Sequence, residues 1–112
     1  MFDMPDAIIN DTLLLKLFKA LADENRMHMV REIARAGELT CSQVVERSPI
    51  GQATVSHHLK ILMESGLLHD RREGQFCHLS VNRELFERFQ GSLDDVLMPC
   101  LAEIDPDQKG KQ

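Results

Sequence analysis

The chain has 112 residues, 43% of them hydrophobic and 28% charged, and a formal net charge of −5 at pH 7, which is typical of one small globular domain. It contains neither the ~18 apolar residues in a row of a membrane span nor, in its first ten residues, the basic start and apolar run of a signal peptide. Its three cysteines are an odd number without paired spacing, which excludes a secreted disulfide framework, so we expect a cytoplasmic protein with reduced thiols and no membrane partner.

Two helices are predicted in the first third of the chain, after a polar and flexible segment at residues 1–6. The first spans residues 7–22, and apolar residues such as Leu13 and Leu17 cover more than one of its faces. Because such a helix needs more than one packing partner, we expect it to pack on its own domain and on a second subunit. Asp23 is a good N-cap for the second helix, at residues 26–36. The residues predicted to face inward from this helix are Met27, Val30, Ile33 and Ala34.

A helix-turn-helix is predicted over residues 40–66. Thr40 is a good N-cap for a short helix at residues 41–47, and Pro49 ensures that the next helix, at residues 51–66, starts afresh after a turn. At about 100° per residue, Val55, Leu59 and Leu62 share one side of that helix and must be buried. Two helices joined by a tight turn, the second amphipathic with a polar outer face, are typical of a helix-turn-helix.

The outer face of helix 51–66 carries small hydrogen-bonding side chains and no large apolar group in its N-terminal half. Any one such residue is more often part of a solvated surface, but the set on a helix-turn-helix favours contact with a DNA major groove. The net charge argues against a nucleic-acid partner, yet residues 40–80 carry four acids and four bases. His58, beside the apolar stripe, is instead expected to be packed and hydrogen-bonded. The predicted DNA contacts are Gln52, Thr54, Ser56, His57, Lys60 and Arg47, with Arg71 and Arg72 of the following segment.

A β-hairpin and a last helix complete the predicted domain, which spans residues 7–100. The hairpin segments are residues 67–71 and 75–81, Gly74 supplies the positive φ of the turn, and Arg71 and Arg72 lie at the tip. A hairpin directly after a reading helix is a wing. Asn82 caps the last helix, Pro99 ends it, and residues 101–112 form a flexible acidic tail. The predicted fold is mainly α with one small hairpin, in the order helix, helix, helix, helix, strand, strand, helix.

Three runs of the sequence resemble the ArsR/SmtB family of bacterial winged-helix repressors: LFKALADENRMHMV, ELTCSQVVERSPIGQATVSHHLKILMESGLL and RREGQFCHLSVN. The resemblance covers roughly residues 13–82. It implies a homodimer formed by the first and last helices, and double-stranded DNA with a twofold-symmetric operator, because two reading helices then enter successive major grooves. The predicted dimer interface consists of Leu13, Leu17, Phe86, Phe89, Leu93, Val96 and Leu97.

The resemblance also implies sensor sites, and this sequence departs from them. The thiolate site of the family has a C-x-C pair where this chain has Thr40 and Ser42, neither of which is a soft ligand. Its site on the last helix needs His, and residues 82–98 contain none. We therefore predict no cofactor, while a metal or metalloid effector stays open. The cysteines Cys41, Cys77 and Cys100 are open to two interpretations, a thiol sensor of oxidants or metalloids and small semi-buried hydrophobic residues.

The sequence thus predicts a homodimeric DNA-binding transcriptional repressor that reads its operator with helix 51–66 and the wing at residues 67–81. Its signal, a small effector or none, is unassigned. No Gly-rich phosphate loop, G-x-S-x-G or H-E-x-x-H motif is present, so no enzymatic activity is expected. Two alternatives remain: a winged-helix module that binds protein without binding DNA, and a repressor that uses its cysteines as a redox or metalloid sensor.

Overall fold

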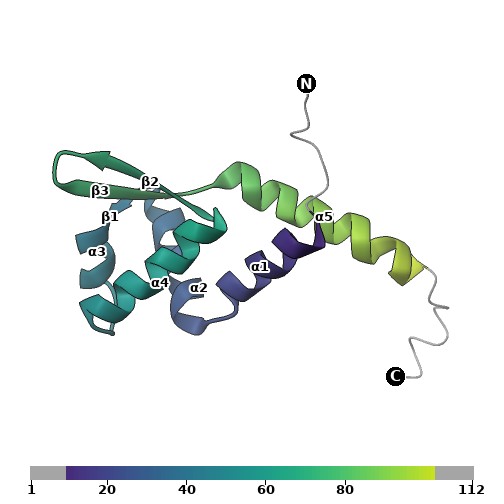
Figure 1. Ribbon diagram of the computed structural model, residues 1–112, viewed down its shortest axis with the longest axis horizontal. Helices are drawn as coiled ribbons and strands as arrows, with labels where there is room; N and C mark the ends of the chain where they lie inside the picture. The colour runs from purple at the N-terminus through teal and green to yellow at the C-terminus, as the bar shows by residue number, and fades with distance from the viewer. Residues whose placement is uncertain (1–9, 103–112) are drawn as a thin grey trace.

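The computed structural model describes residues 10–102 (Figure 1). Over these residues the element order is α1, α2, β1, α3, α4, β2, β3 and α5. The flexible ends predicted at residues 1–6 and over most of 101–112 lie outside the described residues. The helices are α1 (Asp11–Leu21), α2 (Glu24–Ala36), α3 (Cys41–Glu46), α4 (Gln52–Ser65) and α5 (Arg83–Ala102), and the strands are β1 (Leu39–Thr40), β2 (Leu68–Glu73) and β3 (Phe76–Val81).

The winged helix-turn-helix is confirmed, with one strand more than expected. Strand β1 pairs antiparallel with β3, so the sheet order is β1-β3-β2. The hairpin turn falls at Gly74, whose φ of 64° is the positive value expected there. Thr40 and Gln43 form a reciprocal capping box at the start of α3, with bonds of 3.1 and 2.8 Å. The short first helix of the helix-turn-helix is therefore fixed at its N-terminus and tied to the sheet.

Two helix ends differ from the prediction. Helix α1 begins at Asp11 and not at residue 7, because the side chain of Asn10 accepts a 2.8 Å hydrogen bond from the Leu13 N–H and caps the helix there. Helix α5 continues through Pro99 to Ala102, beyond the predicted end of the domain. Proline removes the N–H that would bond the carbonyl of Asp95. Because Asp95 is exposed, water can bond that carbonyl, and the helix tolerates the proline.

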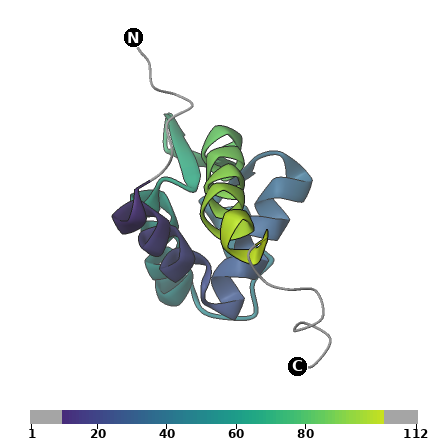
Figure 2. The same ribbon diagram turned by 90° about the vertical axis from the view of Figure 1, so that its right-hand side faces the viewer.

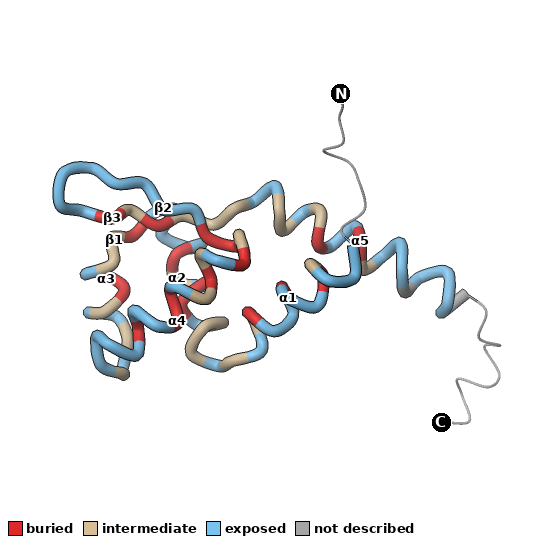
Figure 3. The backbone as a smooth tube through the Cα atoms, viewed as in Figure 1, coloured by how far each residue is buried: buried red, intermediate tan, exposed pale blue. Residues whose placement is uncertain are grey.

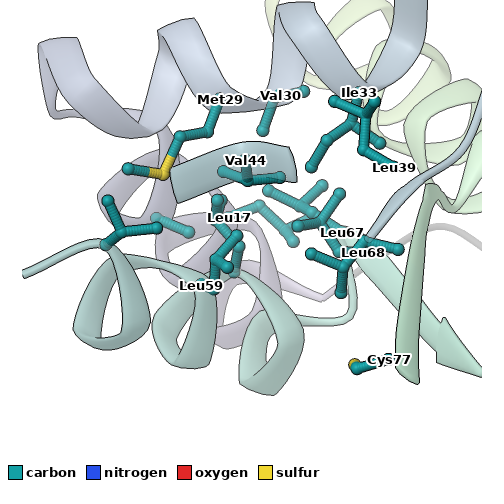
Figure 4. Close-up of a cluster of buried hydrophobic side chains, with 14 of the residues drawn as sticks. Leu17, Met29, Val30, Ile33, Leu39, Val44, Leu59, Leu67, Leu68 and Cys77 are labelled. Atoms are coloured by element: carbon teal, nitrogen blue, oxygen red, sulfur yellow. The ribbon is translucent and has the colours of Figure 1, made fainter. Parts of the chain in front are cut away.

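One hydrophobic core lies between the helices and the sheet (Figure 4). Val55, Leu59 and Leu62 of α4 are buried in it, as their spacing predicts. On α2, Val30 and Ile33 are buried as expected, but the third buried residue is Met29. The predicted positions Met27 and Ala34 are half-buried and exposed, because the inward face of α2 is centred between residues 29 and 33.

Asn82 fixes the end of α4, the wing and the start of α5 relative to one another. Its side-chain nitrogen donates to the Gly66 carbonyl at 2.9 Å, its side-chain oxygen accepts from the Leu85 N–H at 3.2 Å, and its own N–H donates to the Leu67 carbonyl at 2.8 Å. Gly66 has a φ of 91°, and a Cβ there would meet the Leu85 side chain at 3.2 Å. These contacts therefore fix the direction in which the chain leaves α4 and enters the wing.

The molecule has two ends (Figure 1). Helix α3, the first half of α4 and the wing gather at one end, and α5 extends away from the body at the other. Figure 2 looks at the α5 end, where α1 lies beside α5. Among the described residues, no helix combines the length and the apolar character that crossing a membrane requires.

Candidate nucleic-acid interface

Helix α4 presents a polar outer face because its apolar side chains are buried in the core. The backbone of Gly51 caps this helix without a side-chain hydrogen bond, so N–H groups of the first turn stay available. A helix N-terminus of this kind attracts phosphate. The residues of α4 predicted to contact DNA, all of them exposed, are Gln52, Thr54, Ser56, His57 and Lys60.

His58 is buried on the opposite side of α4, as predicted, with 7% of its surface exposed. Its Nδ1 lies 3.1 Å from the Arg26 guanidinium, and its Nε2 lies 3.9 Å from the Asp23 carboxylate. Because a guanidinium only donates, Nδ1 accepts from Arg26, and Nε2 faces Asp23. Arg26 also donates to the carbonyls of Ala20 and Lys19, at 2.6 and 3.1 Å. This Arg26–His58 link joins the end of α1 to the reading helix.

Asp23 caps α2 by accepting a 3.0 Å hydrogen bond from the Arg26 N–H. That bond, helped by the nearby His58 and Arg26 side chains, holds the pKa of Asp23 below its ordinary value. The cap was predictable from the residue type. The role of Arg26 was not, because it depends on contacts with α4.

The two wing arginines have different surroundings, and they lie in β2, behind the tip at Gly74. Arg71 donates to Glu38 at 3.0 and 3.1 Å and to Glu73 at 3.0 Å, and these bonds raise the pKa of Arg71 above its ordinary value. Arg72 is paired with Cys77 across the ladder, and no carboxylate within residues 10–102 forms an ion pair with it. Arg72 therefore carries the more available positive charge of the two.

Arg47, the remaining predicted contact, is exposed just after α3. Its guanidinium lies 3.6 Å from the carboxylate of Glu32 on α2. An exposed ion pair of this length is weak, so it leaves Arg47 able to turn toward phosphate.

The sequence did not predict that Cys41 and Cys77 meet. Pairing of Thr40 with His78 places the adjoining residues, Cys41 and Cys77, next to each other, and both pack on the hydrophobic core. Burial and the neighbouring Cys77 thiol raise the pKa of Cys41 to about 11. Cys100, in contrast, is exposed on α5 at the other end of the molecule, where its thiol donates to the Val96 carbonyl at 3.4 Å.

A cavity of about 160 Å³ lies between α3 and one side of α4. Cys41 lines this cavity together with Gln52 and Ser56, two of the predicted DNA contacts. The residues that line it are Cys41, Ser42, Val45, Gln52, Ser56, Leu59 and Met63.

Several known proteins are similar to this chain in sequence or in fold. A helix-turn-helix domain family matches residues 21–71. An arsenic resistance transcriptional regulator from Pseudomonas putida is 34% identical over 91 residues, which cover 81% of this chain and 71% of that protein. The transcriptional repressor SdpR from Bacillus subtilis is 31% identical over 71 residues, covering 63% of this chain and 78% of the relative. An ArsR-like transcriptional regulator from Rhodococcus sp. RHA1 has a similar fold, with a TM-score of 0.73 at 23% identity over 79% of this chain and 82% of that one.

This chain belongs to the ArsR family of winged-helix transcriptional regulators. Membership confirms the predicted fold class and the prediction of a DNA-binding regulator that is not an enzyme. Within the described residues of this ArsR-family protein, no group of three or more His, Cys, Asp or Glu side chains is arranged to hold a metal ion.

The predicted dimer residues of this ArsR-family chain differ in burial, and the interface itself stays a prediction. Leu17 and Phe89 are buried in the core of their own chain and therefore offer a partner little surface. Val96 is 40% exposed. Leu13, Phe86 and Leu93 are half-buried, and the side chain of Leu97 lies outside what the structure describes.

The outer sides of α1 and α5 carry large apolar residues that the core leaves uncovered. Figure 3 shows the outer half of α5 as mainly exposed. Phe18 of α1 packs edge-on against Phe89 of α5, with ring centroids 5.3 Å apart, yet 43% of it is exposed. We call this the α1–α5 apolar surface, and its residues are Leu15, Phe18, Val96, Met98 and Leu101.

Proposed function

We propose that this protein is a homodimeric transcriptional repressor that reads a twofold-symmetric operator, with α4 in the major groove and the wing beside it. The observation that carries the proposal is the division of α4 into a fully packed apolar side and an exposed side of small hydrogen-bonding groups. Repression is supported by the relative named a transcriptional repressor. A regulator that acts on bacterial DNA works in the cytoplasm.

Dimerisation is supported by the α1–α5 apolar surface. Several large exposed apolar residues on two neighbouring helices of a small domain are typical of a protein interface. A second copy related by a twofold axis would present the same surface, as isologous dimers do. It would also set two copies of α4 at a fixed spacing, which is what binding to a symmetric operator requires.

His57 and Lys60 provide the test of the reading face. Both are exposed on α4, but an imidazole can hydrogen-bond a base edge, whereas a lysine at this position would neutralise phosphate. Fluorescence anisotropy would compare DNA from upstream of the protein's own gene with the same DNA scrambled, over a range of salt concentrations. The wild type should prefer the upstream DNA, with affinity falling steeply as salt rises.

We expect His57→Ala to lower the preference for upstream over scrambled DNA by about 1–3 kcal/mol. The matched variant Lys60→Ala should weaken binding to both DNAs about equally and flatten the salt dependence. An unchanged preference in His57→Ala would show that the face assignment is wrong. Absence of any sequence preference in the wild type would favour the alternative of a protein-binding module.

A further inference from the structure

Cys41 and Cys77 are distant in the sequence but share one place in the fold, where the start of α3 meets strand β3. Cys41 is half-buried, and Cys77 is buried at the edge of the core (Figure 4). From β2, Arg72 and Asp70 also act on Cys41, with opposite charges. Two free thiols on adjoining residues of neighbouring segments, one half-buried and reachable and one enclosed, have the arrangement of an attacking and a resolving cysteine.

We propose that Cys41 and Cys77 are a thiol pair that a low-molecular-weight disulfide oxidises to an intramolecular disulfide, which links the helix-turn-helix to the wing. The Cys41 thiolate attacks one sulfur of the oxidant, breaks its S–S bond and releases one thiol. Cys77 then attacks the Cys41 sulfur of this mixed disulfide, gives up its proton and releases the second thiol. The protein loses two hydrogens and two electrons, and the oxidant gains them as two thiols.

The chemistry of Cys41 makes this reaction slow at neutral pH. Only the thiolate attacks, and with a pKa of about 11 about one Cys41 in ten thousand is ionised at pH 7. Because the ionised fraction rises about tenfold per pH unit below that pKa, the rate of closure should rise in the same proportion. The pair therefore responds to sustained oxidation and not to a brief pulse.

Closure acts on the reading helix through α3. A disulfide holds its sulfurs about 2.05 Å apart, closer than two non-bonded thiols can approach, so it draws the first turn of α3 toward β3. That turn lines the same cavity as Gln52 and Ser56 of α4, and a shift there moves two predicted DNA contacts relative to the wing. We expect the oxidised form to bind operator less tightly, a consequence that rests on the proposed function, whereas the disulfide itself does not.

The test uses the full chain carrying Cys100→Ser, which removes the exposed third thiol and leaves the pair intact. After incubation with oxidised glutathione at pH 7, 8 and 9, trypsin would release residues 36–47 and 73–83 as separate peptides with one cysteine each. We expect mass spectrometry to find them joined, two hydrogens lighter than their sum, with a rate that rises about tenfold per pH unit. Cys41→Ser and Cys77→Ser in the same background should give no joined peptide, and circular dichroism would show that both remain folded.

The outcomes separate the pair from the proposed function. Peptides that stay unjoined after prolonged incubation at pH 9 would overturn the proposal, and a rate independent of pH would overturn the attack by Cys41. If the disulfide forms, operator affinity should fall at least about tenfold and return with dithiothreitol; an unchanged affinity would overturn the regulatory consequence. Failure of the reduced protein to prefer its operator would count against the proposed function alone.

Discussion

The two ends of the molecule expose opposite kinds of side chain. At the DNA-reading end, α4 buries its apolar side and exposes hydrogen-bonding groups such as Gln52 and His57. At the other end, the core covers only part of α1 and α5 and leaves Phe18 and Val96 exposed. A polar face suits a hydrated partner such as DNA, whereas an exposed apolar face suits another protein surface. The two ends therefore suit the two interfaces that the proposed function requires.

The Arg26–His58 link lies between these ends. Arg26 donates to the last carbonyls of α1 and to a histidine whose neighbour in sequence, His57, is a predicted DNA contact. The Arg26–His58 link therefore connects the reading helix to the helix that carries Leu15 and Phe18 of the α1–α5 apolar surface. Substitutions at either end, or at this link, therefore test the role proposed for each region.

The largest effect, on dimerisation and operator affinity, is expected from Val96→Glu, a substitution in the α1–α5 apolar surface. Burying an unpaired carboxylate in a dimer interface costs several kcal/mol, so the variant should be monomeric by analytical ultracentrifugation. Operator affinity should fall roughly 100-fold or more, because one reading helix no longer places the other. Gln90→Glu adds the same charge at an exposed polar position of α5 and should stay dimeric. A dimeric Val96→Glu that still binds operator would contradict this role of the apolar end.

A smaller effect, on the stability of the fold, is expected from Arg26→Ala, which removes the Arg26–His58 link. The change leaves His58 and two carbonyls of α1 without their donor, and losing hydrogen bonds from a charged group in a partly buried site should lower the free energy of unfolding by about 2–3 kcal/mol. Urea denaturation would measure it. Arg31→Ala removes an exposed arginine from the same helix and should change stability by no more than about 0.5 kcal/mol. Equal stability of the two variants would mean that the link does not hold the helices together.

Short-range rules explain what the sequence predicted. The burial of Val55, Leu59 and Leu62 follows from helical periodicity, and the caps at Asp23 and Thr40 follow from side chains that reach backbone groups three residues away. Each of these features follows from the spacing of residues within one helix. The family resemblance then implied the homodimer and the twofold-symmetric operator, which periodicity alone does not specify.

The missed features depend on contacts between distant segments. The two-residue strand β1 is too short to show an alternating pattern, and without it the meeting of Cys41 and Cys77 was not foreseeable. On α1 the apolar residues surround the helix, so spacing could not tell that Leu17 faces its own core while Phe18 stays partly exposed. Periodicity groups residues by side, but tertiary packing decides which side turns inward.

The smallest effect is expected within the wing, where Arg71 and Arg72 carry the same charge in different surroundings. Arg72→Ala should weaken binding to every DNA sequence by about 1 kcal/mol and reduce the salt slope by about one phosphate contact. Arg71→Ala should have less effect, because its guanidinium already bonds Glu38 and Glu73 and must leave them to reach DNA. Anisotropy titrations on scrambled DNA would measure both.

Glu38→Gln provides the matched variant for the wing, because it removes one carboxylate from Arg71 and changes nothing at Arg72. It should raise the affinity for all DNA sequences, and Arg71→Ala made in addition should then lose most of that gain, as expected for coupled neighbours. Equal losses in Arg71→Ala and Arg72→Ala would mean that DNA displaces the ion pairs of Arg71 at little cost. In that case the affinity for DNA would depend on the number of positive charges on the wing, and not on the ion pairs that Arg71 makes in the free protein.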